Sequence, residues 1–251
     1  MSFFSLKKYC GQKIGNYTIS ELVGEGRYGV CFIAVSDIGK KVIIKKFRQG
    51  IFKKNSEKNM HEAVMLSKLK DIRIPELLGV INQKSFYGYV LELKPGNTVK
   101  DLLFKHKHRF SEEEFYNIGL RLIHIIEHLH ENGIVHRDIR IPNVLVDNEN
   151  VYLIDFGLAR FVDSNEYKYD LDYSYLGDFF LYLLYSSFSN KNKYKKLPWH
   201  KELPLTDKQK TFLKKLMGLE TVYGNIEDIE VDFVDAFGCC STLLKTSIHD
   251  V

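Results

Sequence analysis

The feature that most constrains this chain is a pair of polar loops joined by a short apolar hairpin. The first loop spans residues 136–143, and the second spans residues 155–157. The hairpin is predicted from two apolar runs, Val144 to Val146 and Val151 to Ile154. A two-stranded clip of this kind holds the loops that flank it in a defined arrangement. The pattern therefore predicts that Asp138, Asn143 and Asp155 lie close together.

Two carboxylates and one carboxamide in this arrangement suit the transfer of a phosphoryl group. Asp138 would accept the proton of an attacking hydroxyl, while Asn143 and Asp155 would hold Mg²⁺, which prefers hard oxygen ligands. The run His136 to Asp138, together with the run Asp155 to Gly157, resembles the signature of eukaryotic-type protein kinase domains. Either tripeptide alone is common, whereas the two at this spacing are highly specific.

This resemblance implies an α+β, bilobal, protein-kinase-like fold. It has a small antiparallel β lobe that carries one helix, and a larger helical lobe. The pair Pro95-Gly96 marks the boundary, so the two lobes are predicted at residues 1–95 and 96–251. The resemblance also implies ATP as phosphoryl donor, Mg²⁺ or Mn²⁺ as metal ion, and a protein as substrate.

Composition excludes several other classes of protein. A chain of 251 residues with 45% hydrophobic residues can bury a sizeable core, and its net charge of +4 is too mild to indicate nucleic-acid binding. The four cysteines, at positions 10, 31, 239 and 240, show no metal-binding spacing and are expected to be reduced thiols. Residues 1–10 lack the apolar core of a secretion signal, and no apolar run is long enough to cross a membrane. We expect a cytoplasmic protein with no membrane contact.

Residues Tyr17 to Lys46 are predicted to form three strands, with a glycine-rich turn between the first and the second. Gly24, Gly26 and Gly29 match the pattern G-x-G-x-x-G, in which glycines let backbone amides approach phosphate oxygens. The pattern alone is weak, because a plain hairpin also explains it. The third strand strengthens it with Lys45, which by strand alternation shares a face with Ile43, whereas the neighbouring Lys46 points to the other face.

The resemblance assigns the nucleotide site to residues of the first lobe. Its predicted members are Val23, Gly24, Gly26, Gly29, Cys31, Ile43, Lys45, Leu91, Glu92 and Lys94. Leu91 would be the gatekeeper, and the backbone of Glu92 and Lys94 would contact adenine. The family usually has alanine where this chain has Ile43 and valine where it has Cys31, so the roof over adenine is expected to be bulkier than usual.

A helix is predicted from Ser56 to Asp71, and it resembles the regulatory helix of the family. Glu62 is the expected ion-pair partner of Lys45, with Glu57 as its rival, because Glu62 begins the family's E-x-x-x-L order. A hairpin is then predicted from Ile81 to Leu93, ending at the hinge between the lobes.

The second lobe shows helical periodicity. The predicted helices are Asp101 to Lys107, Ser111 to Asn132, Leu176 to Phe188, Thr206 to Met217, and a final one from about Asp232 to Leu244. Ser111 with Glu114 forms a capping box at the start of the long helix. His124, His128 and His130 lie on this apolar helix, and they are predicted to be surface or core histidines and not metal ligands.

The segment that follows Asp155 is much shorter than in typical members of the family. The run Asp172 to Gly177 resembles the family's D-x-W-x-L-G helix start, yet it begins only seventeen positions after Asp155, and no A-P-E motif lies between. The arginine that would pair with the A-P-E glutamate is also missing, since no arginine follows Arg160. We therefore expect a coherent short form, similar to small bacterial serine/threonine kinases.

The shortened segment has consequences for regulation. Its only hydroxyl side chains belong to Ser164, Tyr167 and Tyr169, so switching by phosphorylation of this segment is a weak hypothesis. Arg137, which in the family often contacts such a phosphate, is expected to pair with an acidic residue such as Asp163.

The resemblance also assigns the catalytic roles. Asp138 is the base, Arg140 stabilises charge on the moving phosphoryl group, and Lys45 with Glu62 holds the phosphates. Serine/threonine kinases usually have lysine where this chain has Arg140, and some tyrosine kinases have arginine, so the type of hydroxyl stays open. The expected activity is a serine/threonine protein kinase that also phosphorylates itself.

Three alternatives use the same residues. They are a small-molecule or lipopolysaccharide kinase, a compact ATPase-type partner protein, and a binding-only pseudokinase. A solvated loop is the simplest interpretation of the lysine-rich stretch near residue 195, and an acidic partner or substrate is the functional one. Its basic residues are Lys191, Lys193, Lys195 and Lys196.

Overall fold

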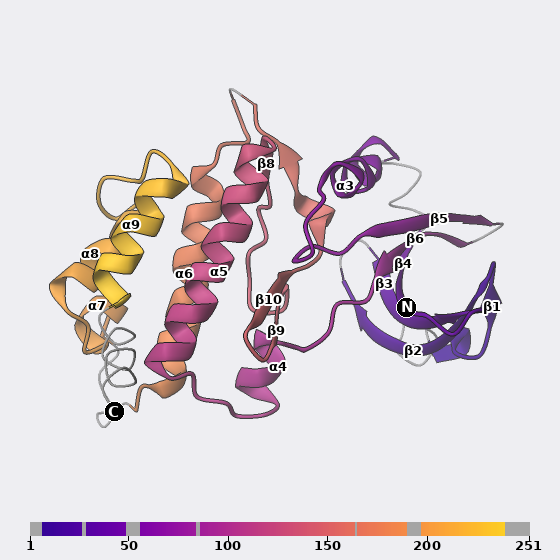
Figure 1. The fold of residues 1–251 in the computed structure, drawn as a ribbon, viewed down its shortest axis with the longest axis horizontal. Coiled ribbons are helices and arrows are strands. Elements are labelled where there is room, and N and C mark those ends of the chain that lie inside the picture. The colour runs from indigo at the N-terminus through magenta and orange to yellow at the C-terminus, as the bar shows by residue number, and fades with distance from the viewer. Residues whose placement is uncertain are drawn as a thin grey trace, which may run out of the picture. The chain divides into compact units, whose positions relative to one another are not determined.

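The computed structural model describes residues 7–26, 29–48, 56–83, 86–163, 165–189 and 197–238 (Figure 1). The chain divides into two compact units, Met1–Lys94 and Pro95–Val251, one residue before the boundary that Pro95-Gly96 predicted. The predicted α+β class is confirmed, because the first unit is an antiparallel sheet with one α-helix and the second is mainly helical. Lys191, Lys193, Lys195, Lys196, Cys239 and Cys240 lie outside the described residues.

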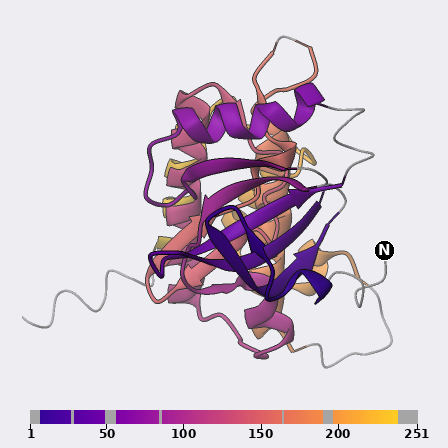
Figure 2. The same cartoon turned by 90° about the vertical axis from the view of Figure 1, so that its right-hand side faces the viewer.

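The first unit is built on one six-stranded antiparallel sheet. Its strands are β1 (Lys13–Ile14), β2 (Tyr17–Glu25), β3 (Gly29–Ser36), β4 (Lys41–Phe47), β5 (Leu77–Gln83) and β6 (Phe86–Glu92), in the order β1-β2-β3-β4-β6-β5. A short 3-10 helix, η1 (Lys7–Tyr9), precedes the sheet, and helix α3 (Ser56–Lys68) lies beside its β5 edge (Figure 2). The predicted strands and helix are thus present.

The second hairpin is longer than predicted. It begins at Leu77 instead of Ile81, with a register shift between Leu77 and Gly79. The residues Leu77 to Val80 do not alternate between polar and apolar types, so periodicity gave no signal for a strand there. The backbone amide of Glu92 donates to the Glu76 carbonyl at 2.9 Å, which extends the pairing to the end of the hairpin.

One face of the sheet carries the apolar core of the first unit. Its fully buried members are Ile19, Phe32, Ala34 and Ile44, with Val30, Val42, Ile81, Phe86 and Val90 around them. The ring of Tyr9, from η1, packs edge-on against Phe32 and Phe86, with ring centres 5.8 and 6.0 Å apart. Burial of this face stabilises the sheet and leaves the opposite face available for a site.

The second unit is organised around one long helix. Its helices are α4 (Val99–Phe104), α5 (Glu112–Glu131), α6 (Asp170–Ser187), α7 (Trp199–Glu202), α8 (Asp207–Leu216) and α9 (Ile226–Phe237). Short strands form two small sheets, one of β7 (Asn97–Thr98), β9 (Val144–Asp147) and β10 (Asn150–Leu153), and one of β8 (Ile134–Val135) with β11 (Arg160–Phe161). Figure 1 shows α5 and α6 side by side, with α9 on one side of them and the β9–β10 hairpin on the other.

Aromatic rings fill the space between the helices of the second unit. Phe180 on α6 lies 5.3 Å from both Phe115 on α5 and Phe233 on α9, measured between ring centres. Gly119 is needed here, because any side chain on it would collide with the ring of Phe233. These ring contacts pack α5 tightly against α6 and α9.

Helix α5 begins and ends almost where the sequence predicted. Ser111 caps it, the Ser111 and Glu114 side chains form the reciprocal capping box, and Gly133 follows its last turn with φ of 67°. Helix α8 has the same device at Thr206 and Gln209. In the part of the chain that the structure describes, no helix is both long and apolar enough to cross a bilayer.

Two other predicted helices were misplaced. Helix α4 runs from Val99 to Phe104 and not from Asp101 to Lys107, because the side chain of Thr98 caps it by accepting from the Asp101 amide. The last described helix begins at Ile226 and not near Asp232. Asn225 caps it by accepting a hydrogen bond from the Asp228 amide. The predicted continuation to Leu244 extends beyond the described residues.

Candidate active site

The glycine turn joins β2 to β3 in the first unit. The Gly26 amide donates to the Gly29 carbonyl at 2.9 Å, which closes the turn. Gly29 has a structural reason to be glycine, since a side chain there would collide with the Lys46 carbonyl on β4. Gly24 and Gly26 have no such reason, because a Cβ atom added at either would meet nothing within 4 Å. Their backbone therefore borders open space, where a ligand can approach closely.

The register of the sheet places the predicted nucleotide residues on one face. Cys31 pairs with Lys45 across β3 and β4, and Ile43 pairs with Leu91 across β4 and β6. Because residues opposite each other in a sheet point to the same side, Cys31, Ile43, Lys45 and Leu91 share the face opposite the apolar core. Val23 lies at the register shift just before Gly24, and it is 55% exposed.

Lys45 and Glu62 form a buried ion pair in the first unit. The Lys45 Nζ atom lies 2.7 and 2.9 Å from the two carboxylate oxygens of Glu62, and the two residues are 5% and 2% exposed. A buried pair of this kind depends on both partners, because the removal of one leaves an uncompensated charge. The side chain of the rival Glu57 lies outside the described set.

Lys46 occupies the opposite face of β4, as strand alternation predicted. Its Nζ atom lies 5.4 Å from the ring centres of both Tyr9 and Phe86. It is thus part of the packing around the apolar core and is separated from the face that carries Lys45.

The end of β6 presents the residues that were predicted to contact adenine. Leu91 is 7% exposed, and the Lys94 Nζ atom donates to the Ile72 carbonyl at 2.7 Å and pairs with the Glu92 carboxylate at 2.7 Å. Burial raises the pKa of Glu92, but the hydrogen bonds from Lys94 and the Glu76 amide, together with the positive charges of Lys94 and Lys40, outweigh it and leave the pKa below its usual value. These two side chains hold each other, and the contact of their backbone groups with adenine stays a prediction.

Asp138 is fixed by its neighbours in the first polar loop of the second unit. The Asn143 side-chain amide donates to the Asp138 carboxylate at 2.7 Å and to its carbonyl at 2.9 Å. The Arg140 guanidinium makes a two-pronged contact with the same carboxylate, one prong at 2.9 Å, and this hydrogen bonding raises the pKa of Arg140. Asp138 is 6% exposed, so its carboxylate is oriented by the protein and not by water.

The apolar hairpin holds the second polar loop next to the first. Strands β9 and β10 pair from Val144 with Leu153 to Asp147 with Asn150, and the Ile154 amide donates to the Asn143 carbonyl at 2.9 Å. Asp155 follows directly, is exposed, and has φ of 66°. Its side chain accepts from the Gly157 amide at 3.3 Å. The clip predicted from the sequence is present, and it brings Asn143 and Asp155 into adjacent positions.

Asn143 and Asp155 fit a magnesium ion by their chemistry. Both offer hard oxygen donors, and Asp155 is exposed on its loop. Among the described residues there is no group of three or more histidine, cysteine, aspartate or glutamate side chains that could hold a metal. A small ligand set of this kind suits Mg²⁺, which keeps several of its waters and takes further oxygens from phosphates.

Asp172 on α6 is a site residue whose role the sequence reasoning missed. It is completely buried and accepts hydrogen bonds from the backbone amides of His136 at 2.8 Å and Arg137 at 2.7 Å. His130 Nε2 lies 3.2 Å from the same carboxylate. The sequence indicates only a helix start at Asp172, whereas in the structure this buried carboxylate, with its several donors, anchors the loop that carries Asp138.

The predicted pair between Arg137 and Asp163 is wrong. The Asp163 carboxylate accepts backbone amides from its own loop, at 2.7 Å from Glu166 and 2.9 Å from Tyr167. Arg137 instead donates to the Leu158 carbonyl at 3.2 Å and lies over the ring of Tyr167. The short side chain of Asp163 accepts hydrogen bonds from the nearby backbone amides of its own turn, so it is not available to Arg137.

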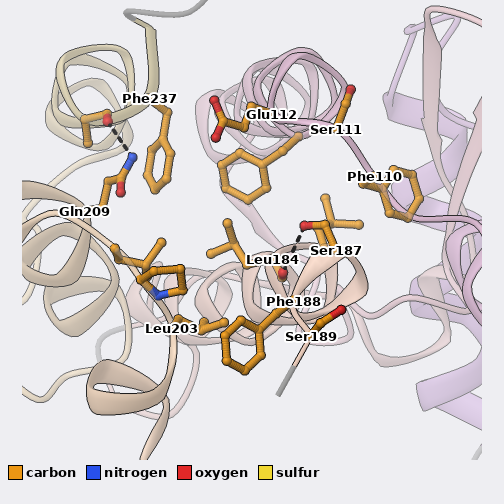
Figure 3. A pocket seen from close by; sticks show the side chains of 15 residues that line it. Phe110, Ser111, Glu112, Leu184, Ser187, Phe188, Ser189, Leu203, Gln209 and Phe237 are labelled. Atoms are coloured by element: carbon orange, nitrogen blue, oxygen red, sulfur yellow. Dashed lines mark hydrogen bonds between the residues drawn. The ribbon is translucent and has the colours of Figure 1, made fainter. Parts of the chain in front are cut away.

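A separate pocket of about 300 Å³ lies elsewhere in the second unit (Figure 3). The end of α6 and the start of α5 line it, with apolar residues such as Leu184, Phe188, Leu203 and Phe237 around a few polar side chains. None of the residues predicted for the site lines this pocket.

Comparison with known proteins agrees with the geometry. A protein kinase domain model matches residues 17–178. A protein of Bacillus subtilis (strain 168) named "Probable serine/threonine-protein kinase YbdM" is 34% identical over 227 residues, which cover 86% of this chain and 87% of that protein. The hormonally up-regulated neu tumor-associated kinase of Homo sapiens is 34% identical over 155 residues, which cover 59% of this chain and 22% of that much longer protein.

The matched range holds the glycine turn, the Lys45–Glu62 pair and both polar loops of the second unit. The bacterial relative matches over nearly the full length of both chains. This chain therefore belongs to the protein kinase family.

Proposed function

We propose that this protein is an ATP-dependent protein kinase that transfers the γ-phosphoryl group of ATP to serine or threonine hydroxyls of protein substrates, and of itself. The observation that carries the proposal is the state of Asp138, a buried carboxylate oriented by Asn143 and Arg140. Family membership supports the reaction, and the name of the Bacillus subtilis relative supports serine/threonine as the acceptor.

Asp138 would act as the catalytic base. Its carboxylate accepts the proton of the substrate hydroxyl as the oxygen attacks phosphorus. Asn143 keeps the carboxylate in one orientation, which reduces the loss of freedom at the moment of reaction. Arg140 is more exposed, with 56% of its side chain accessible, so its guanidinium can turn from Asp138 towards the phosphoryl group and stabilise the charge there.

ATP would lie against the face of the first unit that carries Cys31, Ile43 and Lys45. The backbone at Gly24 and Gly26 borders open space and would approach the phosphates. Lys45, oriented by Glu62, would pair with the phosphates, while the backbone at Glu92 and Lys94 would contact adenine. Ile43 would form a bulkier roof over adenine than alanine does.

Asn143 and Asp155 would hold the magnesium ion. When bound, this ion neutralises negative charge on the phosphate oxygens. The hydrogen bond from the Ile154 amide to the Asn143 carbonyl supports this role, because it joins the two loops.

The proposal is tested by incubating the purified full chain with radiolabelled ATP, Mg²⁺ and a generic protein acceptor. We expect label on the acceptor and on the chain itself, with phosphoserine and phosphothreonine after acid hydrolysis. The Asp138→Asn variant should lose at least about a hundredfold in rate, because general-base catalysis contributes about 10²–10⁴-fold. Asp178→Asn, an exposed change on α6, is the matched control and should retain the rate.

Each contrary outcome points to a different function. Hydrolysis of ATP without labelled protein would support an ATPase-type partner protein, and label on small molecules alone would support a small-molecule kinase. An Asp138→Asn variant as active as the unchanged protein would refute the assignment of the base.

A further inference from the structure

The short segment between Asp155 and α6 is tied to the second unit by contacts of its own. Arg160–Phe161 pairs with Ile134–Val135 as a two-stranded sheet, and the Val162 amide donates to the Gly133 carbonyl at 2.8 Å. Further along, the Tyr169 hydroxyl donates to the His130 carbonyl at 3.0 Å. The segment is thus fastened at both ends, and Tyr167 lies between these attachments.

A tight turn presents Tyr167. The Asp163 carboxylate accepts from the amides of Asn165, Glu166 and Tyr167 at 3.0, 2.7 and 2.9 Å, and the Asp163 amide donates to the Tyr167 carbonyl at 3.0 Å. The amide donors, that of Tyr167 first, lower the pKa of Asp163, so the carboxylate stays charged near neutral pH. The turn therefore fixes the backbone at Tyr167 with groups of the segment itself.

Arg137 is the residue that meets this ring. It has φ of 65°, a conformation that residues other than glycine rarely adopt, and its amide is held by Asp172 at 2.7 Å. Its guanidinium carbon lies 4.5 Å from the centre of the Tyr167 ring, and Nη1 donates to the Leu158 carbonyl at 3.2 Å. Arg137 thus connects the backbone beside Asp138 to both halves of the segment.

We propose that Tyr167 is a positioning residue, whose ring holds Arg137 and orders the segment beside the catalytic loop in place of a phosphate. This inference rests on the proposed kinase function, and it explains how the segment beside the loop of Asp138 is kept ordered. The aromatic face of tyrosine attracts a guanidinium within about 6 Å. The kinase is then competent as synthesised, with no phosphorylation of Ser164, Tyr167 or Tyr169 required.

The contributions of the ring and of the hydroxyl of Tyr167 can be separated by substitution. In the described part of the chain the Tyr167 hydroxyl makes no hydrogen bond, so the contact with Arg137 belongs to the ring alone. Tyr167→Phe keeps the ring and removes the only atom of this side chain that could be phosphorylated. Tyr167→Leu keeps apolar bulk and removes the aromatic face.

The experiment measures kcat and KM for ATP with the full chain, first treated with a protein phosphatase and then freed of it. We expect Tyr167→Leu to lower kcat roughly three- to tenfold and to change KM for ATP by less than about twofold. The contact between Arg137 and the ring is partly exposed and therefore weak, but it acts on the loop that carries Asp138. Tyr167→Phe should have a kcat within about twofold of that of the unchanged protein. Tyr182→Leu, which removes a half-exposed ring on α6, is the control and should behave as the unchanged protein.

A second measurement does not depend on activity. Amide hydrogen exchange of residues 158–169 should be faster in Tyr167→Leu than in the unchanged protein, and normal in Tyr167→Phe and Tyr182→Leu. If the unchanged protein transfers no phosphate, the proposed function fails while this exchange pattern still decides whether the ring orders the segment. The inference is overturned if Tyr167→Phe loses as much activity as Tyr167→Leu, or if Tyr167→Leu matches the unchanged protein in both kcat and exchange.

Discussion

At the scale of single residues, His136 shows how one ring can make the site depend on pH. It is completely buried, its Nδ1 accepts from the Asp138 amide at 3.3 Å, and its ring packs edge-on against Phe156 with centres 4.8 Å apart. An accepting Nδ1 carries no proton, so the ring is neutral in this arrangement. Burial lowers the pKa of His136 below its ordinary value of 6.5, although the nearby Asp172 opposes the shift.

We therefore predict that His136 makes folding less favourable in acid. Because its pKa is lower in the folded than in the unfolded chain, its contribution is complete above about pH 6.5 and is lost as pH falls below that value, by at most about 1.4 kcal/mol per pH unit. Urea unfolding between pH 7.5 and 5.5 measures the slope. His136→Phe should show a smaller slope than the unchanged protein, and His106→Gln, at an exposed site, should not. Equal slopes for His136→Phe and the unchanged protein would contradict this.

At the scale of elements, helix starts were predictable where a serine or threonine stands three residues before a glutamate or glutamine. The capping boxes at Ser111 and Thr206 follow from residues three positions apart, and both helices begin where those caps placed them. Asn225 also caps α9, but asparagine followed three residues later by Asp228 does not match the pattern of serine or threonine with glutamate or glutamine. That helix was consequently placed six residues too late.

The cap of α5 should contribute measurably to stability. Ser111→Ala removes the acceptor of the Glu114 amide, 3.1 Å away, and should lower the free energy of unfolding by about 1 kcal/mol. Asn117→Ala, an exposed change within the same helix, is the control and should alter stability by less than about 0.5 kcal/mol. Chemical denaturation measures both, and a Ser111→Ala variant as stable as the control would show that the cap is not needed.

At the scale of the whole molecule, short motifs predicted which residues belong to the site, but they predicted less well which other residues these contact. Strand alternation selected Lys45 over Lys46, and hairpin spacing predicted the clip between Asn143 and Asp155. The pairing of Lys45 with Glu62 came from the resemblance to the family's motif order. The role of Asp172 and the contact of Arg137 with Tyr167 depend on contacts between residues about 30 positions apart. Such contacts are set by how helices pack, so neither periodicity nor composition could indicate them.

We propose that Lys45 and Asp155 both act on bound Mg²⁺-ATP. The most direct test is the affinity for Mg²⁺-ATP, measured by calorimetric titration of Lys45→Met, Asp155→Asn and the double variant. Lys46→Met, on the opposite face of β4, and Asp178→Asn are matched controls. We predict that each single variant binds Mg²⁺-ATP at least about tenfold more weakly, a loss of about 1.4 kcal/mol in binding free energy, and that the controls bind normally. The double variant should lose less binding free energy than the sum of the two single losses. Unchanged affinity in Lys45→Met or Asp155→Asn, or a chain that binds no nucleotide at all, would contradict the claim.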